Sequence, residues 1–582
     1  MTADEREAPL VIIQQDGRWW RYEGLERVIA AGQPNEVAAA VVEVERAVEG
    51  EGLIAAGYLA YEAAAAYGLA VHSPDADGPP LLWFGLFRRR EAVAPPSNPG
   101  SFRFGEWQPA LDFAAYAAAI ERIKAAIARG DTYQANLTFH LTASFDGEPQ
   151  ALFAALAAAQ RADFCAYLNL GRFVICSASP ELFFRRDGVA LESRPMKGTA
   201  ARGLTLAQDR EQIGWLHYSE KNRAENVMIV DMIRNDFGRI ARTGSVHVPT
   251  LFAVERYPTL LQMTSTVRAE TDGPLSDVLA AVFPCASITG APKVRTMQLL
   301  RELESGPRGI YTGAIGTILP GRRAQFNVAI RTTVIDRLRG AATYGVGSGV
   351  VWDSDAADEY AECLLKARVL SVAPDSAPFD LLESLLWTPD AGYFLRERHL
   401  RRLAESAEYF ACPIDIKTVE RQLDGLADEL AEPSKVRLLV GRAGDTRVEA
   451  RPLAEGAPPE PIRVGLAGQP VSSADVFLYH KTTRRAVYDT ARAARPDCDD
   501  VILFNERGEL TESSAANLVV FLDGRAWTPP VSAGLLAGTL RAELLATGAI
   551  AERTLTAADL ARAEHIELIN SVRGRRRAVL VD

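Results

Sequence analysis

One lysine stands in a segment whose composition could serve catalysis. Lys197 lies in "LESRPMKGTAARG", residues 191–203, where Pro195 and two glycines favour a turn. A lysine amine is nucleophilic only when neutral, and burial or a neighbouring cation lowers its pKa. Lys197 is therefore a candidate nucleophile, and a salt-bridge partner is the open alternative.

A second lysine, Lys481, lies in "FLYHKTTRRAVYD" with one histidine and two arginines beside it. Lysines close to cations titrate at lower pH and can form Schiff bases. The same composition is also typical of a basic surface patch, so the spacing by itself leaves both interpretations open.

Carboxylates form the third group of candidates. Glu181 lies in "SPELF" and Glu225 in "RAENVMIVD", while Glu359 and Glu362 lie three residues apart in "DEYAEC" and so share one helix face. Carboxylates without histidine or cysteine suit a hard cation such as Mg²⁺. The alternative is a set of helix faces paired with neighbouring basic residues.

The segment "GVGSGV", residues 345–350, is expected to be a glycine-rich loop at the end of a strand. It lacks the G-x-G-x-x-G spacing and no helix start follows, so a dinucleotide site is only weakly indicated. Its backbone amides could hold a carboxylate. Arg331, Lys293 and Lys197 could supply positive charge to the same small polyanion.

Length and composition limit the class of protein. The chain has 582 residues, which predicts two to four domains. Its net charge of −11 argues against a nucleic-acid or acidic-membrane partner, and the "RGRRR" patch, residues 573–577, is interpreted as solvated or substrate-facing. The start of the chain does not resemble a signal peptide, no apolar run is long enough for a membrane span, and the six cysteines are scattered. We therefore expect a cytoplasmic protein.

Hydrophobic periodicity places the candidates on elements. Helices are predicted over 111–131, 221–240 and 358–370, two strands over 173–195, and a strand, turn and strand over 313–336. The Ala/Ser/Pro-rich segment 371–378 separates this part from a new strand, turn and amphipathic helix. We predict one domain over residues 1–372 and another over 378–582.

Eight motifs in the first domain carry a resemblance to a known family. They are "GDTYQANLT", "SASPELFF", "RPMKGT", "RAENVMIVDMIRND", "ASITGAPKVRTM", "GIYTGAIG", "AIRT" and "GVGSGVVWDSD…EYAE…KA", in this order over about residues 110–370. Together they resemble the chorismate-utilising enzymes, which include anthranilate, aminodeoxychorismate and isochorismate synthases. The resemblance implies an α+β fold, a sandwich of two sheets with helices, and an active site in a deep cleft.

The resemblance gives Lys197 a role. Aminodeoxychorismate synthases have Pro-Ile-Lys-Gly-Thr where this chain has "PMKGT", whereas anthranilate synthases have alanine in place of the lysine. It implies that Lys197 attacks C2 of chorismate and that Glu181 acts as the general acid for the leaving C4 hydroxyl.

The same resemblance implies a metal site and a substrate site. Glu225 and Glu362 would bind Mg²⁺, with Glu359 as a water-mediated partner, and the ion would hold the ring carboxylate. The residues that would line the substrate pocket are Tyr311, Arg331, Ser287, Thr289, Lys293, Gly345, Gly347 and Gly349.

Two positions depart from the family pattern. Asn222 stands in "KNRAEN" where the family has an acidic residue, which we expect to weaken Mg²⁺ binding. Gln262 stands where many relatives have histidine. If that histidine assists pyruvate elimination in anthranilate synthases, its absence fits an enzyme that keeps the enolpyruvyl group.

The second domain resembles the fold-type IV pyridoxal-phosphate enzymes through "FLRERHLRRLAESAEYF", "YHKTTRR", "NERGELTESSAANLVVF", "GLLAGTLR" and "LINSVRG". This family includes branched-chain and D-amino-acid aminotransferases and 4-amino-4-deoxychorismate lyase, and its two-subdomain α/β fold is expected here. The resemblance implies that Lys481 binds pyridoxal 5'-phosphate covalently. The remaining cofactor and pocket residues would be Arg402 and the amides of Thr539 and Leu540 at the phosphate, Glu512 at the pyridine nitrogen, and Asn517, Asn570 and Ser571 in the pocket.

The two resemblances together imply a bifunctional enzyme of folate biosynthesis. Its first half would aminate chorismate to 4-amino-4-deoxychorismate, and its second half would eliminate pyruvate to give 4-aminobenzoate. We expect ammonia from a separate glutamine amidotransferase subunit and a possible homodimer through the second domain. The alternatives are an anthranilate or isochorismate synthase domain joined to an aminotransferase, and a non-catalytic metabolite-binding subunit.

Overall fold

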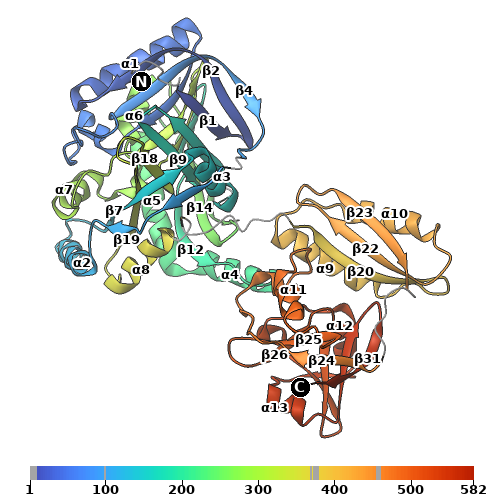
Figure 1. Ribbon diagram of the computed structural model, residues 1–582. Helices are drawn as coiled ribbons and strands as arrows, with labels where there is room; N and C mark the ends of the chain where they lie inside the picture. Colours follow the sequence, from blue (N-terminus) through green and yellow to red (C-terminus); the bar gives the residue numbers. More distant parts are fainter. Residues whose placement is uncertain are drawn as a thin grey trace. The chain divides into compact units, whose positions relative to one another are not determined.

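The computed structural model describes residues 9–97, 100–160, 162–367, 370, 379–453 and 460–581. The chain forms two compact units, one of residues 1–201 with 213–376 and one of 202–212 with 377–582 (Figure 1). The second unit includes the short segment 202–212 because the Tyr409 hydroxyl donates to the Gly203 carbonyl at 2.7 Å. The predicted boundary at 371–378 lies outside the described residues, so the domain limits stay a prediction.

Antiparallel pairs join most strands of the first unit into one long ladder. The path of hydrogen-bonded neighbours runs through β13 (His247–Arg256), β14 (Leu260–Glu270), β11 (Ala190–Arg194), β10 (Leu182–Asp187), β17 (Arg323–Val328), β16 (Ala314–Leu319), β3 (Ile54–Leu59), β4 (Leu82–Val93), β2 (Arg18–Ala31), β1 (Leu10–Gln15), β8 (Phe164–Asn169), β9 (Phe173–Ser179), β18 (Thr332–Asp336), β19 (Ala341–Val350) and β7 (Gln134–Gly147). β12 (Met196–Ala201) adds to β14, and β5 (Phe102–Phe104), β6 (Gln108–Pro109) and β15 (Gly290–Ala291) add to β7.

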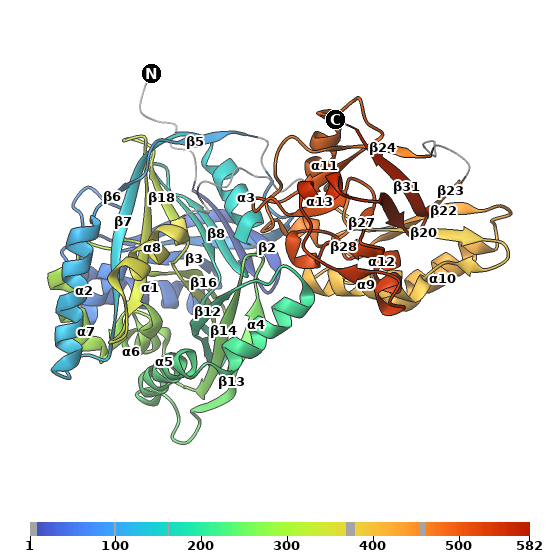
Figure 2. The same ribbon diagram turned by 90° about the horizontal axis from the view of Figure 1, so that it is seen from below.

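This ladder builds two hydrophobic cores. The first lies where α1 (Pro34–Glu51), α5 (Glu220–Gly238) and α6 (Leu275–Val282) cover β2, β3, β4 and β16. The second lies where α2 (Phe113–Ala128), α3 (Pro149–Gln160), α7 (Lys293–Leu303) and α8 (Ala356–Ala367) cover β7, β8, β9 and β19 (Figure 2). The remaining helical elements are η1 (Tyr61–Tyr67), α4 (Leu206–Tyr218) and η2 (Ala286–Ile288). The predicted α+β class is confirmed. The strands that line the two cores belong to one continuous ladder.

Local sequence explains where the helices near the site begin and end. The Asp112 side chain accepts a hydrogen bond from the Ala115 amide and caps α2, and Gly130 follows that helix with φ of 76°. Ser219 caps α5 in the same way by accepting from the Asn222 amide. The helices predicted over 111–131 and 221–240 are therefore confirmed, as α2 over Phe113–Ala128 and α5 over Glu220–Gly238.

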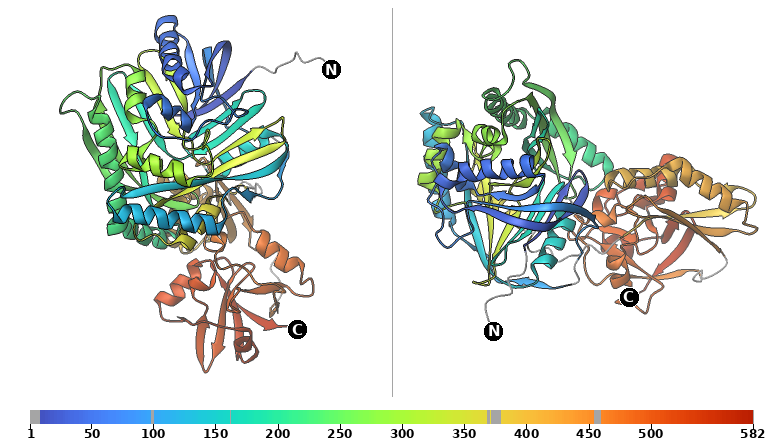
Figure 3. Two further views of the ribbon diagram at one scale, coloured as in Figure 1. Left: turned by 90° about the vertical axis from the view of Figure 1, so that its left-hand side faces the viewer. Right: turned by 90° about the horizontal axis from the view of Figure 1, so that it is seen from above.

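The second unit contains two sheets (Figure 3). The smaller sheet has the order β21 (Gly392–Tyr393), β20 (Leu381–Thr388), β22 (Ser434–Val440), β23 (Thr446–Pro452), and it packs with α9 (Arg396–Tyr409) and α10 (Ile416–Ala427) around one core. The predicted strand, turn and helix after the boundary are β20 and α9.

The larger sheet closes on itself. Its neighbours run β26 (Leu510–Ser513), β25 (Asp500–Phe504), β24 (Ile462–Leu466), β31 (Gly574–Leu580), β30 (His565–Asn570), β27 (Asn517–Leu522) and back to β26, with β28 (Arg525–Thr528) and β29 (Ala551–Glu552) beside β27. The helical elements around it are η4 (Val476–Leu478), α11 (Ala486–Ala493), η5 (Val531–Ala533), α12 (Thr539–Ala546) and α13 (Ala557–Ala561). In the described part of the chain, no helix is both long and apolar enough to cross a membrane.

Candidate functional site

Lys197 is carried by a strand and not by the turn predicted for this segment, and hydrogen bonds to the backbone hold that strand. Lys197 lies on β12, and Gly198 directly after it has φ of 93°, a conformation that glycine adopts readily. The Gln262 amide donates to the Gly198 carbonyl at 2.8 Å, and the Asn226 amide donates to the Lys197 carbonyl at 3.4 Å. The backbone around Lys197 is therefore held from β14 and from α5.

The position of the Lys197 amine follows from two other residues. A Cβ atom built on Gly349 would lie 2.9 Å from the Lys197 Nζ and 2.6 Å from the Gln134 Nε2. Both nitrogen atoms thus lie over the same glycine of β19. Burial lowers the pKa of Lys197, and the positive charge of Lys366 lowers it further against the opposing effect of nearby carboxylates. These features favour the neutral, nucleophilic amine.

Glu181 lies in the same site as Lys197. It follows β9, its side chain is only 3% exposed, and its Oε1 accepts a hydrogen bond from the Ser287 hydroxyl at 2.6 Å. Burial raises the pKa of Glu181 to about 7, although Ser287 and the charge of Lys197 act in the opposite direction. A carboxyl group with this pKa can hold a proton near neutral pH, as a general acid must.

The three glutamates predicted to bind metal are electrostatic neighbours. Burial raises the pKa of Glu225, and the negative charges of Glu359 and Glu362 raise it further. Glu362 forms an ion pair with Lys366 at 2.7 Å, and Glu359 accepts from the Ser354 hydroxyl at 2.7 Å. Among the described residues, no three histidine, cysteine or acidic side chains converge closely enough to form a metal cluster.

The chemistry of these donors nevertheless fits a hard cation. The set contains only carboxylate oxygens, which are the ligands that Mg²⁺ prefers. The Lys366 ammonium lies where it neutralises one of them, so an ion at this place would take over the charge that Lys366 now balances. Glu225 and Glu362 are the residues that would hold it, and the ion would there neutralise a substrate carboxylate.

The glycine-rich segment is a strand and not the predicted loop. Residues 341–350 pair with β7 along their whole length, from Ala341 with Ser144 to Val350 with Ala135. The glycines serve close packing, since a Cβ on Gly345 would lie 2.1 Å from the Tyr311 ring. The Gly347 carbonyl accepts from Lys366, so this edge of the strand faces the candidate site.

The other residues predicted for the substrate pocket contact different parts of the first unit. Tyr311 is buried beside Gly345, and Arg331 donates to the Lys366 carbonyl at 2.9 Å. The Thr289 hydroxyl donates to the carbonyls of Cys285 and Ala286 within its own turn. The Lys293 ammonium is held by Asp236 at 2.6 Å. Their contact with substrate stays a prediction.

Gln134 is a site residue that the motifs did not single out. It is 1% exposed, and its Oε1 has no hydrogen-bond partner within the described residues. A buried amide oxygen without a partner costs free energy unless a ligand supplies the missing donor. The available sequence signal was a glutamine at the start of β7, a strand in which polar and apolar residues alternate.

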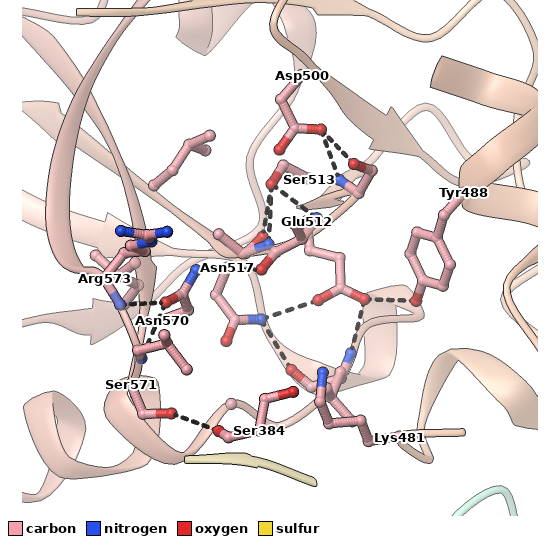
Figure 4. A pocket seen from close by; sticks show the side chains of 18 of the residues that line it. Ser384, Lys481, Tyr488, Asp500, Glu512, Ser513, Asn517, Asn570, Ser571 and Arg573 are labelled. Atoms are coloured by element: carbon pink, nitrogen blue, oxygen red, sulfur yellow. Dashed lines mark hydrogen bonds between the residues drawn. The ribbon is translucent and has the colours of Figure 1, made fainter. Parts of the chain in front are cut away.

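The second unit carries its own site around Lys481. This lysine follows η4 and is half-buried, and desolvation together with the charge of Arg402 lowers its pKa to about 8. Burial raises the pKa of Glu512 to about 7, and its carboxylate accepts from the Tyr488 hydroxyl at 2.8 Å, the Asn517 amide at 3.1 Å and the Leu536 amide at 3.1 Å. Figure 4 shows Glu512 between Tyr488 and Asn517, with Lys481 beside it.

A buried acidic residue orients Arg402. The Arg402 guanidinium donates to both oxygens of Glu383, at 2.9 and 2.6 Å, and His399 lies 2.7 Å from the same carboxylate. Burial would raise the pKa of Glu383, but Arg402 and His399 outweigh it and lower the pKa to about 2. His399 also lies within hydrogen-bond distance of the hydroxyl of Ser571, which follows β30, and of the hydroxyl of Thr539, the first residue of α12 after Gly538. Glu383 and His399 were not predicted from the sequence.

A cavity of ≈ 820 Å³ lies at this site, and its lining includes the predicted Arg402, Lys481, Glu512, Asn517, Thr539, Asn570 and Ser571. The donor set fits a phosphorylated pyridine aldehyde. Lys481 supplies the amine, Glu512 a partner for the ring nitrogen, and Arg402 with the start of α12 a place for phosphate. The predicted Leu540 is the second residue of α12 and is 7% exposed.

Comparison with known proteins agrees with this division. Residues 7–372 match the family model described as chorismate binding enzyme, and residues 380–581 match the model described as amino-transferase class IV. The second match implies pyridoxal phosphate as a cofactor of that half.

Individual relatives cover parts of the chain. It is 42% identical over 260 residues to aminodeoxychorismate synthase component 1 of Bacillus subtilis, which covers 44% of this chain and 55% of that protein. It is also 42% identical over 267 residues to an anthranilate synthase component 1 of Haloarcula marismortui, covering 45% and 54%. The chain thus spans about half the length of these curated relatives.

A solved structure shows the same fold as the first unit. It is that of a 2,3-dihydroxybenzoate-specific isochorismate synthase from Bacillus anthracis, with 20% identity and a TM-score of 0.52 over 63% of this chain and 97% of that one. On the family match over residues 7–372 and the site described above, the chain belongs to the chorismate binding enzymes, and it carries a class IV aminotransferase domain after them.

Proposed function

We propose that the chain makes 4-aminobenzoate from chorismate in two steps. The observation that carries the proposal is the convergence of Lys197 and Glu181 in one buried site, with the pKa of the lysine lowered and that of the acid raised to about 7. A neutral amine and a protonated carboxyl group are the forms that a substitution with loss of hydroxide requires.

In the first step, the Lys197 amine attacks C2 of chorismate. The ring double bond shifts, the C4 hydroxyl leaves, and the proton of Glu181 converts it to water. Ammonia then adds at C4, the double bond shifts back, and the bond between C2 and Lys197 breaks. Chorismate and ammonia thus give 4-amino-4-deoxychorismate and water, and the lysine is regenerated.

Glu225 and Glu362, with Glu359 beside them, would hold Mg²⁺ against the ring carboxylate. Tyr311, Arg331 and the open edge of β19 would bind the enolpyruvyl carboxylate, because they supply hydroxyl, guanidinium and backbone donors on one side of the site. A Cβ atom built on Gly198 would lie 3.0 to 3.2 Å from the Asn222 side chain, so Asn222 packs against the residue that follows Lys197.

In the second step, the residues around Lys481 remove pyruvate. Bound pyridoxal phosphate supplies an electron sink for charge that develops at the carbon bearing the amine. Lys481 removes the proton from ring C4 and later protonates the released three-carbon unit. Glu512 keeps a proton on the pyridine nitrogen. Cleavage at the C3 oxygen leaves 4-aminobenzoate and pyruvate.

The partner and the cofactors belong to the same proposal. The Bacillus subtilis relative is named as component 1, which fits a separate amidotransferase that supplies ammonia. We also place Mg²⁺ in the first unit and pyridoxal phosphate at Lys481.

A second candidate pairs an anthranilate synthase with an aminotransferase. The similarity to the Haloarcula marismortui protein and the class IV model favour it. Lys197 argues against it, because a nucleophilic lysine is not needed to add ammonia at C2.

Product analysis separates the two candidates. The purified chain is incubated with chorismate, Mg²⁺, ammonium and pyridoxal phosphate, and the aromatic amines are resolved by chromatography and mass. We expect 4-aminobenzoate with an equal amount of pyruvate. Formation of 2-aminobenzoate would support the second candidate, and absence of both amines would contradict both.

A further inference from the structure

The cavity at Lys481 is strongly cationic. Nine of its lining side chains are basic and four are acidic. The basic ones are Arg402, Lys435, Arg437, Arg451, Lys481, Arg485, Arg492, Arg573 and Arg576. A cofactor phosphate needs only the few donors at Arg402 and α12, so most of this positive charge has another purpose.

The basic side chains form two groups. The positive charges that act on Lys481 are those of Arg402 and Arg485. Partial desolvation lowers the pKa of the exposed Lys435, and the positive charges of Arg437, Arg573, Arg451 and Arg485 lower it further. The second group thus consists of Lys435, Arg437, Arg451 and Arg573, and Arg485 acts on both Lys435 and Lys481.

Two members of the second group are neighbours on adjacent strands of the smaller sheet. Lys435 on β22 and Arg451 on β23 are direct antiparallel partners. Like charges in such a position destabilise a sheet. The alternate residues Val436 and Ala450 point to the opposite face and pack in the core of the smaller sheet. The fold itself therefore gains nothing from the two charges.

No acidic side chain compensates this pair within the described residues. Arg437 has Glu449 at 4.0 Å, whereas no ion pair is formed by Lys435 or Arg451 in that part of the chain. Arg573 is held beside them, since its guanidinium donates to the Leu453 carbonyl just after β23 at 2.6 Å. Three cations thus converge on the open part of the cavity.

We propose that Lys435, Arg451 and Arg573 form a subsite that binds the carboxylates of a dicarboxylate amine. The inference rests on the proposed function and deepens it, because it assigns the residues that select a substrate with two carboxylates over a monocarboxylate amino acid. Such a substrate presents its amine to Lys481 and its acidic groups to the opposite wall. A monocarboxylate contacts only part of this subsite, and this lowers its affinity.

The test uses the full chain loaded with pyridoxal phosphate and two probes that lack an amine. Isophthalate carries two carboxylates on one ring, and benzoate carries one. Binding is followed by the absorbance of the bound cofactor, which reports on this cavity and not on the chorismate site. The variants are Lys435→Met and Arg451→Met, with Arg421→Met as a matched control on the exposed surface of α10.

We expect isophthalate to bind about tenfold more tightly than benzoate, and each variant to lose about tenfold in isophthalate affinity. The control should change neither value, and added salt should weaken isophthalate more than benzoate. Both variants should keep or raise the melting temperature because the like-charge pair is removed. A loss of affinity with an unchanged melting temperature therefore does not come from unfolding.

Two results would overturn the subsite. One is isophthalate binding no tighter than benzoate, or giving no saturable change. The other is equal weakening by Arg421→Met and the two variants. If wild type makes no 4-aminobenzoate but the dicarboxylate preference and its loss in the variants remain, the subsite stands and the reaction proposed for this half is wrong.

Discussion

The Ser287 hydroxyl donates a hydrogen bond to the Glu181 Oε1 at 2.6 Å, and both side chains are buried. This bond stabilises the ionised form of Glu181, while burial stabilises the protonated form. Burial prevails and raises the pKa to about 7, so the pair can lose and regain a proton near neutral pH.

Replacing Glu181 with glutamine should remove the general acid. Because such groups contribute roughly 10²–10⁴-fold, we expect amination of chorismate to slow by about that factor. In wild type, the acid form is present below the pKa, so the amination rate should fall as the pH rises through about 7. A pH profile of ammonia-dependent turnover for both proteins checks this, and an unchanged alkaline limb in Glu181→Gln would contradict it.

Replacing Ser287 with alanine should shift the alkaline limb of the pH profile of amination. The hydrogen bond from Ser287 lowers the pKa of Glu181, so its removal raises that pKa further. The alkaline limb of the amination rate should therefore move to higher pH. A shift to lower pH would show that another group controls it.

Gly349→Ala should disturb Lys197 without unfolding the chain. The new methyl group would meet the flexible ends of Lys197 and Gln134 at 2.9 and 2.6 Å, and these ends can move aside. Since a displacement of about 1 Å can cost about 100-fold in rate, we expect a loss of that order in amination kcat with an unchanged melting temperature. Gly214→Ala is the control, because a Cβ there meets nothing within 4 Å.

Glu512→Gln should stop the second step and spare the first. A neutral amide cannot keep the pyridine nitrogen protonated, so 4-amino-4-deoxychorismate should accumulate while chorismate consumption continues. Tyr488→Phe should act in the same direction but more weakly, because it removes one of the hydrogen bonds that stabilise the ionised Glu512. Chromatography of the intermediate measures both, and equal loss of the two steps would argue against separate sites.

Arg308→Met should destabilise the first unit alone. Arg308 and Glu304 form an ion pair at 2.7 Å with side chains only 2% and 5% exposed, so removing one partner leaves a buried charge. We expect a loss of about 3–5 kcal/mol. Calorimetry should show a lower melting temperature for the first unit. The melting temperature of the second unit, which pyridoxal phosphate raises, should stay unchanged. The double variant Arg308→Met/Glu304→Leu should recover part of the loss.

The sequence predicted the helices near the site because their caps and apolar spacing are local. α2 and α5 have side-chain caps from Asp112 and Ser219, and the amphipathic helix after the boundary is α9. The segment 173–195 forms three strands where two were predicted, since buried strands form continuous apolar runs without a clear period.

Long-range relationships could not be predicted from spacing. Glu383 and His399 meet because β20 and α9 pack together. Glu383 lies outside the quoted motifs, and nothing in the motif that contains His399 indicates its partner. The function of the glycines at 345–349 depends on Tyr311 and Gln134, which come from other parts of the chain. Such contacts arise from tertiary packing, which local patterns do not encode.

The most direct test of the proposed two-step reaction compares wild type with Lys197→Ala and Lys481→Ala. Each protein receives chorismate, Mg²⁺, ammonium and pyridoxal phosphate, and chorismate, aminodeoxychorismate, 4-aminobenzoate and pyruvate are separated by chromatography. If both lysines have the proposed roles, wild type makes 4-aminobenzoate and pyruvate. Lys481→Ala then stops at aminodeoxychorismate, and Lys197→Ala leaves chorismate unchanged. Full 4-aminobenzoate formation by Lys197→Ala, or 2-aminobenzoate from wild type, would contradict it.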